Sequence, residues 1–319
     1  MQKQDYLWKG IVSKLFPDFM RLVHPEIEQV LDLDRECEFL DKELQQVDQL
    51  ADGKYAQRIV DHLVKVYTKE GNDNYILLHV EVQGRYSAKF SERMFQYYYL
   101  LKNKYKRSVA AYAIFTEASK KHRPNRFTTS FHGTEVSYKF NTYKISTASD
   151  RELTNNKNPF AIIILAARAN YAAKHITNPD LRDLHLKDLK IELIKKVLKL
   201  NLDNKKITDI FYFIINYISF EFSETSAIFA NELAVLTKNS KVMGVVEELV
   251  KYEKIASFEE GQRTGKKMGE QLGKKIGKNE LQKKQILDLL LKKKLNDEQI
   301  AEFIQVSIKL VKSLKSSIN

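Results

Sequence analysis

The sequence predicts an α+β (mixed α/β) fold, with a central mixed sheet flanked by helices and an α-helical C-terminal extension. Three observations predict this class. Apolar residues recur at helical spacing near the N-terminus, alternate with other residues between 58 and 83, and return to helical spacing almost throughout from Pro159 onward. Helices and strands in this order indicate a sheet packed against helices. With 319 residues, 43% of them hydrophobic, the chain has enough apolar material for a sizeable core.

The first expected element is an amphipathic helix over residues 5–23, where Leu7, Ile11 and Leu15 recur at helical spacing. Pro17 is expected to break this helix late, because proline lacks the backbone N–H that a helix interior uses. A second helical stretch is expected at about 36–46, in the segment that contains FLDKEL.

A β-hairpin is expected next. Residues 58–68 alternate in character, the polar segment TKEGNDN with Gly71 forms a turn, and residues 75–83 resume the alternation. Two strands with a short polar link pair antiparallel. One face of this hairpin is apolar and carries Val60, Val64, Val66, Leu78, Val80 and Val82.

The rest of the chain is expected to add one helix and several strands, and then helices only. The next helix spans about 88–104, a buried strand spans 109–116, and further strands lie within 126–147. The inner face of that helix carries Phe90, Met94, Tyr97 and Leu101. The later helices are expected at 160–175, 186–200, 206–219, 224–237 and 241–254.

Three domains are expected from these patterns. The polar, breaker-rich segment SDRELTNNKN separates the mixed part from the helical part. The expected domains are therefore a core at 1–155, an α-helical extension at 156–255, and a basic tail at 256–319.

The charge of the chain favours a polyanionic partner. Lysine and arginine exceed aspartate and glutamate by 12, which gives a pI near 9.3. Residues 256–319 hold 14 basic and 8 acidic side chains, so half of the surplus lies in a fifth of the chain. Many basic proteins never contact nucleic acid, so a motif is needed to decide.

The expected location is the cytoplasm, without membrane contact. The N-terminal segment MQKQDYLWKG lacks the layout of a signal peptide. The longest apolar run, 160–167, is far shorter than the roughly 20 residues that a bilayer span requires. Cys37 is the single cysteine, so no internal disulfide forms, which fits a reducing compartment.

The second face of the hairpin carries the groups that suggest chemistry. Asp61 lies on its first strand, Glu81 and Gln83 lie on its second, and Lys65 shares the face of Asp61. Two carboxylates are costly to bring together unless a cation neutralises them. Magnesium favours carboxylate oxygens and stabilises the charge that develops in phosphodiester hydrolysis. As a spacing alone, the same residues equally describe exposed strand carboxylates and a solvated glutamine.

Several segments together resemble one family. The chain resembles the Rpn-type recombination-promoting nucleases, which are also called PD-(D/E)XK family putative transposases. The segments that carry the resemblance are DHLVKV, LLHVEVQG, the helix SERMFQYYYLL, the upstream DYLWKGIV and FLDKEL, and a C-terminal glycine repeat followed by IAEFIQVSIKLVKSL. The resemblance covers nearly the whole chain and is most specific over 55–101. It implies a restriction-endonuclease-like core, dependence on Mg²⁺ (or Mn²⁺), and cleavage of DNA in recombination or mobile-element transposition.

The resemblance also implies roles for single residues. Asp61 matches the first motif aspartate and Glu81 the acid of the E-x-Q motif, so both are expected to hold the metal. Gln83 stands where the wider superfamily commonly has lysine, and glutamine can orient water only through neutral hydrogen bonds. A further hypothesis is that Lys65, on the neighbouring strand, supplies the positive charge that this lysine gives in the wider superfamily. An acid from the first helix often joins such sites.

Asp5 is the best match for that acid and Glu43 the second candidate. Arg93 and Tyr97, four apart on the helix after the hairpin, are expected to face the cleft and contact DNA phosphate.

Other polar and aromatic side chains near the pair have plainer expectations. His79 shares the face of Glu81 and is expected either to orient water or to support the site as a hydrogen-bonded neighbour. His62 points to the apolar side and is expected to be structural, while Tyr98 and Tyr99 are expected to pack.

A glycine repeat opens the tail, with Gly261, Gly265, Gly269, Gly273 and Gly277 at every fourth position. Each glycine inside a helix costs roughly 1 kcal/mol relative to alanine. A compensating close approach of helices is therefore expected, either within the chain or between the subunits of a homo-oligomer. The lysines between the glycines exclude lipid, and a flexible basic linker is the alternative.

Residues 296–315 suggest a small helix-turn-helix. Its first helix is expected to begin at Asn296 or Asp297 and its second at Ser307. Such a unit is expected either to contact DNA or to pack on itself as a helical hairpin. Its first helix carries Ile300, Ala301 and Ile304.

The leading functional hypothesis is a magnesium-dependent DNA endonuclease, in which Asp61 and Glu81 hold the metal and Gln83 positions the attacking water. The alternative is a DNA-binding or assembly protein that keeps the nuclease fold without cleaving.

Overall fold

The computed structural model describes residues 3–41, 61–70, 75–238, 244, 251, 266, 269–270, 273–274, 276–292 and 295–316. The chain forms two compact units, Met1–Lys254 and Ile255–Asn319. Helices of the expected extension at 156–255 share one hydrophobic core with the sheet, so they belong to the first unit.

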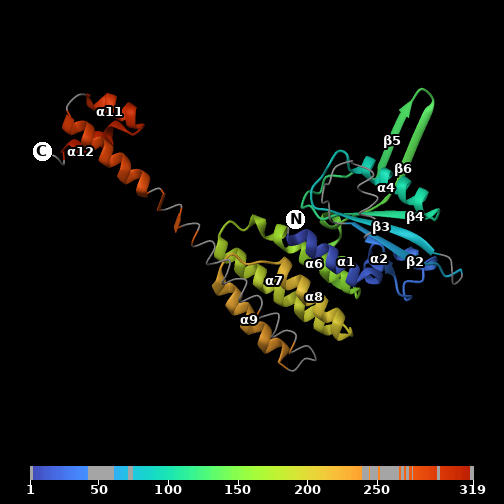
Figure 1. The fold of residues 1–319 in the computed structure, drawn as a ribbon. Coiled ribbons are helices and arrows are strands. Elements are labelled where there is room, and N and C mark those ends of the chain that lie inside the picture. Colours follow the sequence, from blue (N-terminus) through green and yellow to red (C-terminus); the bar gives the residue numbers. More distant parts are fainter. Residues whose placement is uncertain are drawn as a thin grey trace. The chain divides into compact units, whose positions relative to one another are not determined.

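Within the described residues, a five-stranded mixed sheet lies at the centre of the first unit (Figure 1). The strands are β1 (Glu38–Phe39), β2 (Asp61–Tyr67), β3 (Tyr75–Gln83), β4 (Val109–Phe115) and β7 (Asn141–Lys144), in the order β1-β2-β3-β4-β7. The first three pair antiparallel, and β3, β4 and β7 pair parallel. The expected antiparallel pairing of the hairpin strands and the mixed sheet are thereby confirmed. Val60 and the expected turn at Gly71 lie outside the described residues.

The N-terminal helix is confirmed, but it is divided at Leu15 into α1 (Lys3–Lys14) and α2 (Phe16–Val23). Pro17 lies in the first turn of α2, where a missing N–H leaves no hydrogen bond unmade. The helix expected at about 36–46 is wrong for residues 38–39, which form the edge strand β1. Residues 42–46 of that segment lie outside the described part.

The two faces of the sheet are covered by different helices (Figure 1). α1 and α2 lie against the face to which Leu78, Val80 and Val82 of β3 contribute. α4 (Phe90–Tyr105) covers the opposite face and buries Phe90, Met94, Tyr97 and Leu101, as the helical spacing predicts. The alternation along β3 therefore decides which side chains meet α4.

The first four of the five helices expected after Pro159 are confirmed, and their bounds differ from the expected ones by up to seven residues. They are α6 (Pro159–Ala172), α7 (Pro179–Lys199), α8 (Asn204–Tyr217) and α9 (Ser223–Thr237), and α5 (Asp150–Asn155) precedes them. Short 3₁₀ helices occur at Pro25–Gln29, Ile145–Thr147 and Ala173–His175. Residues 241–254 lie largely outside the described part.

The helical layer is joined to α1 through Trp8. Its indole Nε1 donates to the Tyr217 hydroxyl at 3.3 Å, and the indole ring meets Phe160 and Phe213. Buried aromatic side chains from α1, α6 and α8 thus pack together in one core.

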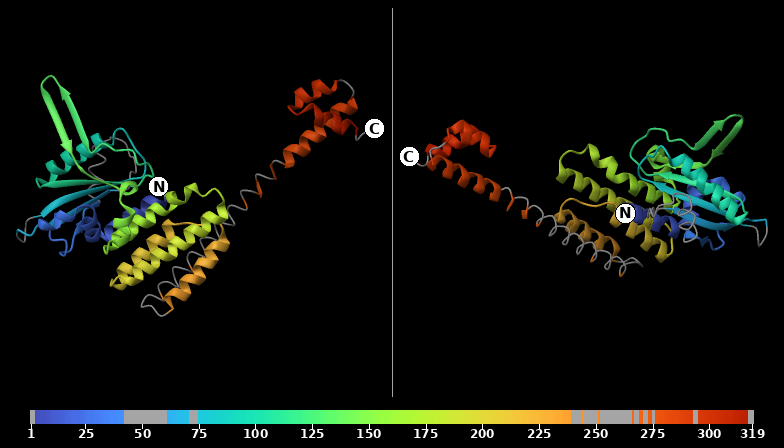
Figure 2. Two further views of the ribbon diagram at one scale, coloured as in Figure 1. Left: turned by 180° about the vertical axis from the view of Figure 1, so that it is seen from behind. Right: turned by 45° about the horizontal axis from the view of Figure 1, so that its top comes forward.

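A two-stranded hairpin, β5 (Arg126–Phe131) and β6 (Thr134–Lys139), projects from the sheet (Figures 1 and 2). Its turn uses positive φ at His132 and Gly133. Its base packs on α4, where Tyr138 meets Tyr98 at a ring separation of 4.8 Å.

The second unit contains a helical segment over 276–292, α11 (Asp297–Ile304) and α12 (Ile308–Ser316). The expected cap at Asn296 is confirmed. A Cβ added at Gly269, Gly273 or Gly277 would meet no described atom within 4 Å apart from its chain neighbours and its own helix backbone. Among the described residues nothing therefore approaches these three positions closely, and the expected close approach of helices stays a prediction. Gly261 and Gly265 lie outside the described residues.

In the part of the chain that the structure describes, no helix is both long enough and apolar enough to cross a membrane.

Candidate active site around Glu81

The register of β2 and β3 places Asp61 directly opposite Glu81. Residues directly opposite each other in an antiparallel pair lie on the same face of the sheet. The backbone therefore puts the two expected metal-binding positions at one point of the hairpin. The side chain of Asp61 lies outside the described ones.

The Glu81 carboxylate is completely buried, and its two oxygens have different surroundings. Oε2 accepts a hydrogen bond from Nη2 of Arg93 at 2.8 Å and one from Nε2 of Gln83 at 3.3 Å. Within the described residues, Oε1 accepts none, and Nε2 of His79 lies 3.6 Å from it. A buried carboxylate oxygen without a donor is costly, so this atom has unused capacity as a ligand.

Two elements create this environment. Glu81 faces α4 because it alternates with Val80 and Val82, which face the main core. Arg93 lies in the first turns of α4 and reaches back to the strand. In this structure the guanidinium of Arg93 pairs with Glu81, and the expected contact of Arg93 with DNA phosphate stays a prediction.

His79 lies beside Glu81, but within the described residues neither of its ring nitrogens has a hydrogen-bond partner, so the expected hydrogen-bonded neighbour is wrong there. It is completely buried and meets the ring of Tyr97 edge to face at 5.0 Å. Burial lowers the pKa of His79 and nearby Arg93 lowers it further, while Glu81 acts in the opposite direction. The ring is therefore neutral at neutral pH, and its 3.6 Å approach to Glu81 is not an ion pair.

Tyr97 is placed differently from the expectation that it contacts DNA. Its side chain is 1% exposed and lies in a cluster with Leu63, Leu77 and Leu101, so phosphate has no access to it. Tyr99, expected to pack, is 60% exposed, and that expectation is wrong.

The fold does not place Lys65 next to Glu81. It lies opposite Leu77, four residues along β2 from Asp61. Its ammonium is 3.2 Å from Oε2 of Glu38 and 4.7 Å from the centre of the Tyr75 ring. The ion pair and the aromatic ring hold the charge at the other end of the hairpin.

Among the candidate acids from the N-terminal region, Asp5 lies on α1 and Glu43 lies outside the described residues. Burial raises the pKa of Tyr217 on α8, and the negative charge of the Asp5 carboxylate raises it further. No contact between Asp5 and Glu81 is seen in the described part of the chain.

Asp41, within the FLDKEL segment, is an acid that the sequence interpretation did not select. It accepts hydrogen bonds from Nδ1 of His62 at 3.0 Å and from the backbone N–H of Leu63 at 3.2 Å, and Lys9 lies 3.4 Å away. Burial alone would raise the pKa of Asp41, but the His62 and Lys9 interactions hold it below its usual value.

His62 itself is structural, as expected. Its side chain is buried, and Nε2 lies 2.9 Å from the carbonyl oxygen of Lys9, which ties β2 to α1. Asp41 and His62 therefore set the position of the first strand of the hairpin.

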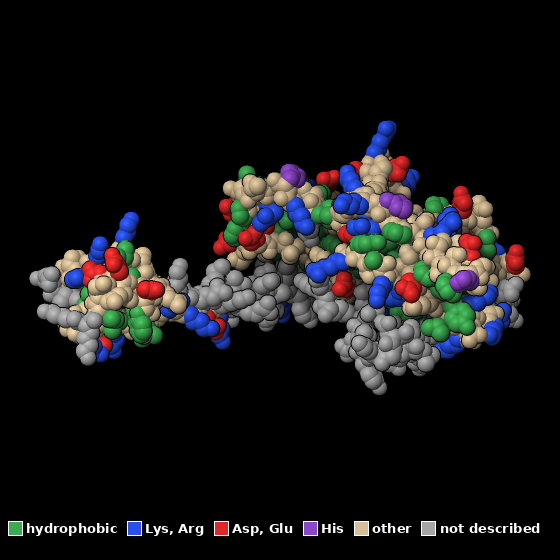
Figure 3. Space-filling model, turned by 90° about the horizontal axis from the view of Figure 1, so that it is seen from above, with side chains coloured by type: hydrophobic (Ala, Val, Ile, Leu, Met, Phe, Trp, Pro, Cys, Tyr) green, Lys and Arg blue, Asp and Glu red, His purple; other side chains and the backbone are tan. Residues whose placement is uncertain are grey.

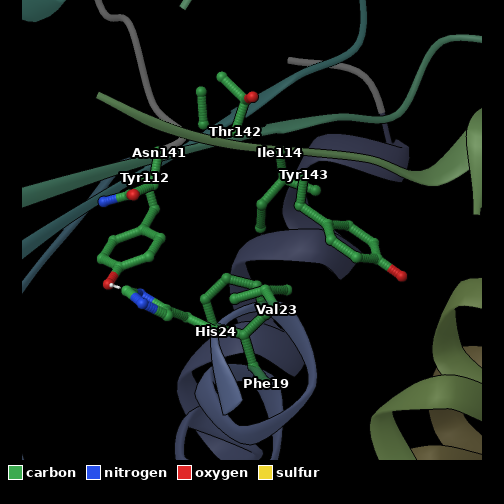
Figure 4. A pocket seen from close by; sticks show the side chains of 9 residues that line it. Phe19, Val23, His24, Tyr112, Ile114, Asn141, Thr142 and Tyr143 are labelled. Atoms are coloured by element: carbon green, nitrogen blue, oxygen red, sulfur yellow. Dashed lines mark hydrogen bonds between the residues drawn. The ribbon is translucent and has the colours of Figure 1, made fainter. Parts of the chain in front are cut away.

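Two cavities among the described residues lie away from Glu81. One of about 130 Å³ is lined by His24, Tyr112 and Asn141, with Nδ1 of His24 2.7 Å from the Tyr112 hydroxyl (Figure 4). Tyr112 belongs to the main core, whereas Glu81 lies opposite Ala113 on the other face. The second cavity, of about 280 Å³, lies between α1 and α8.

The face of the molecule seen in Figure 3 carries charges of both signs. Lysine and arginine side chains on that face are mixed with aspartate and glutamate and do not gather in a single patch.

The residues fit a hard divalent cation in part. Carboxylate oxygens are the ligands that Mg²⁺ prefers, and Oε1 of Glu81 is such an oxygen without a donor. Among the side chains that the structure describes, no group of three or more His, Cys, Asp or Glu could hold a metal. The side chain of Asp61 is not one of the described side chains. The fit therefore rests on Glu81 and on the register position of Asp61.

Comparisons of the chain with protein-family models, with curated proteins and with solved structures find no match.

Proposed function

We propose that the chain is a Mg²⁺- or Mn²⁺-dependent endonuclease that hydrolyses phosphodiester bonds in DNA. The observation that carries this proposal is the buried Glu81 carboxylate, whose Oε1 accepts no hydrogen bond within the described residues, with Asp61 opposite it in the register. A buried, partly unsatisfied carboxylate reduces stability, and such groups concentrate at functional sites.

Asp61 and Glu81 are the residues that would hold the metal. When bound, Mg²⁺ supplies neutralisation of developing negative charge and activation of a water. Arg93 and Gln83 both donate to Oε2 of Glu81, so they orient the carboxylate and leave Oε1 for the cation. The amide oxygen of Gln83 remains an acceptor that can orient a water.

The proposed core is restriction-endonuclease-like. Support comes from the resemblance of residues 55–101 to the Rpn-type nucleases and from a mixed sheet with α1 and α4 on opposite faces. A role in recombination or mobile-element movement follows from that resemblance alone.

The test is nicking of supercoiled plasmid DNA by the full chain with Mg²⁺, with Mn²⁺ and with chelator. Glu81→Gln and Asp61→Asn are expected to lower the rate by roughly 100-fold or more. Glu117→Gln is the matched control, because that carboxylate pairs with Arg123 and Lys144 beyond the end of β4 and is expected to leave nicking unchanged.

A binding readout accompanies the activity. Mg²⁺ is expected to raise the unfolding temperature of the wild type and of Glu117→Gln, but not of Glu81→Gln, because a ligand stabilises only the state that binds it. A wild type that neither cuts DNA nor responds to either metal would overturn the proposal.

A second candidate function is a DNA-binding or assembly protein that keeps the fold without cleaving. Its supporting observation is Arg93, which already provides a positive charge beside Glu81, together with glutamine at position 83 in place of lysine. DNA binding in chelator without nicking in either metal would favour this function.

A further inference from the structure

The second unit has a hydrophobic core of its own. Ile286 from the helical segment 276–292, Ile300 and Ala301 from α11, and Val311 from α12 are buried together. Three helical pieces thus enclose one small cluster. α11 and α12 therefore do not form a bare hairpin, since the helix before them completes their core.

The connection between α11 and α12 is short and well defined. α11 begins with a capping box, in which the Asn296 side chain accepts from the N–H of Gln299 at 2.8 Å and the Gln299 side chain accepts from the N–H of Asn296 at 3.0 Å. It ends at Gln305, whose φ of 57° turns the chain. α12 begins three residues later, at Ile308. A turn of this length is that of a helix-turn-helix.

Specific contacts fix the two helices against each other. The N–H of Val306 donates to the carbonyl of Ala301 at 2.9 Å, which closes the turn. Lys315 near the end of α12 pairs with Asp297 at the start of α11, at 2.7 Å. The small side chain of Ala301 shares the buried cluster with Val311, so it leaves room for α12 to lie close.

The opposite side of α12 is exposed and carries lysine and serine side chains. Lys309, Lys312, Ser313 and Ser316 are all exposed, and their spacing of i, i+3, i+4 and i+7 puts them on one helical face. α12 has no acidic residue. This face therefore offers ammonium and hydroxyl groups, which donate to phosphate oxygens and to acceptors on base edges.

We propose that α11 and α12 form a helix-turn-helix that binds duplex DNA, with α12 in the major groove and Lys309 and Lys312 at phosphates or base edges. The major groove of B-form DNA is about 12 Å wide and admits an α-helix, whereas the major groove of A-form RNA is too narrow. The surplus of positive charge in residues 256–319 agrees with a polyanionic partner. This binding site is separate from Glu81 and does not depend on cleavage.

The test measures binding of the full chain to a labelled duplex on the order of 20 base pairs, by fluorescence anisotropy, in chelator so that no cleavage occurs. The double variant Lys309→Gln/Lys312→Gln is expected to bind about tenfold or more weakly. Its plot of log affinity against log salt concentration is expected to be shallower by about 2, since each lost phosphate contact removes about one unit.

The matched control is Lys283→Gln/Lys284→Gln, which removes the same charge from exposed positions of the helical segment 276–292. It is expected to bind DNA more tightly than the α12 double variant. Ser313→Glu, which adds one carboxylate to the α12 face, is expected to weaken binding as well. Circular dichroism verifies that each variant keeps its helices.

Two outcomes would overturn the inference. One is an equal loss of affinity in both lysine double variants, which would indicate only general attraction between charges. The other is equal affinity for duplex RNA of the same sequence, since α12 cannot enter its major groove. Binding is measured in chelator and nicking is measured with metal, so failure of the nuclease proposal and failure of this one are distinguishable.

Discussion

Nη2 of Arg93 lies 2.8 Å from Oε2 of Glu81, so a side chain near the start of α4 neutralises a carboxylate that β3 buries completely. The two partners differ in their access to water. The Arg93 side chain is 21% exposed, whereas that of Glu81 is 0% exposed. Loss of Glu81 leaves an arginine that water can still reach, while loss of Arg93 leaves a buried acid without its counter-charge.

Arg93→Ala is therefore expected to lower the free energy of unfolding by about 3–5 kcal/mol, the usual cost of breaking a buried pair from one side. Urea unfolding at neutral pH measures it. Arg182→Ala is the matched control, because Arg182 pairs with Glu221 at the surface and its loss is expected to cost about 0–1 kcal/mol. Equal costs for the two variants would contradict the role assigned to Arg93.

His79 is expected to make stability depend on pH in a defined window. Burial and Arg93 lower the pKa of His79 in the folded state, so below pH 6.5 the unfolded chain binds the proton more readily. The contribution of His79 to stability is thus complete above its unfolded pKa of about 6.5 and is lost progressively as the pH falls.

The slope that His79 adds to the free energy of unfolding is at most about 1.4 kcal/mol per pH unit. His79→Phe, which keeps a ring against Tyr97, is expected to remove this slope between about pH 6.5 and 5. His122→Gln, at an exposed loop position, is expected to retain it. Urea unfolding at several pH values measures both, and an unchanged slope in His79→Phe would show that His79 is not its source.

Lys65→Ala is expected to leave metal-dependent nicking close to the wild-type rate. Lys65 is engaged by Glu38 and Tyr75, four residues along the strand from Asp61, which corresponds to roughly 13 Å. Plasmid nicking measures the rate, with Glu81→Gln as the inactive reference. A loss comparable to that of Glu81→Gln would mean that Lys65 leaves Glu38 when DNA binds.

The double variant Gly273→Ala/Gly277→Ala is expected to weaken self-association of the chain. Within the described part of the chain, no atom outside the helix itself meets a Cβ at these positions, which leaves room for a second copy to approach closely. Sedimentation over a range of concentrations measures the association. Unchanged association together with a gain in helix stability of about 1 kcal/mol per site would favour the linker interpretation instead.

Much of the fold could be predicted because burial imposes a period on each element. The alternation along residues 75–83 predicted that Val80 and Val82 lie on one face of the strand and Glu81 on the other. The helical spacing of α4 predicted that Tyr97 lies on its inner face. The same spacing argues against a role for Tyr97 at phosphate, because a ring that faces the sheet is not accessible to DNA. The edge strand at 38–39 had no such period, since two residues are too few to show one.

By itself the sequence determined which residues alternate, where Asp61 and Glu81 fall in a hairpin, and that a capped two-helix segment follows the glycine repeat. Only the tertiary structure decided that Arg93 reaches Glu81, that Lys65 is held by Glu38, and that Asp41 binds His62. Those contacts depend on how α4 lies over β3 and how β1 pairs at the edge of β2. A period along one element records which face is buried, but it carries no information on which side chain of another element meets that face.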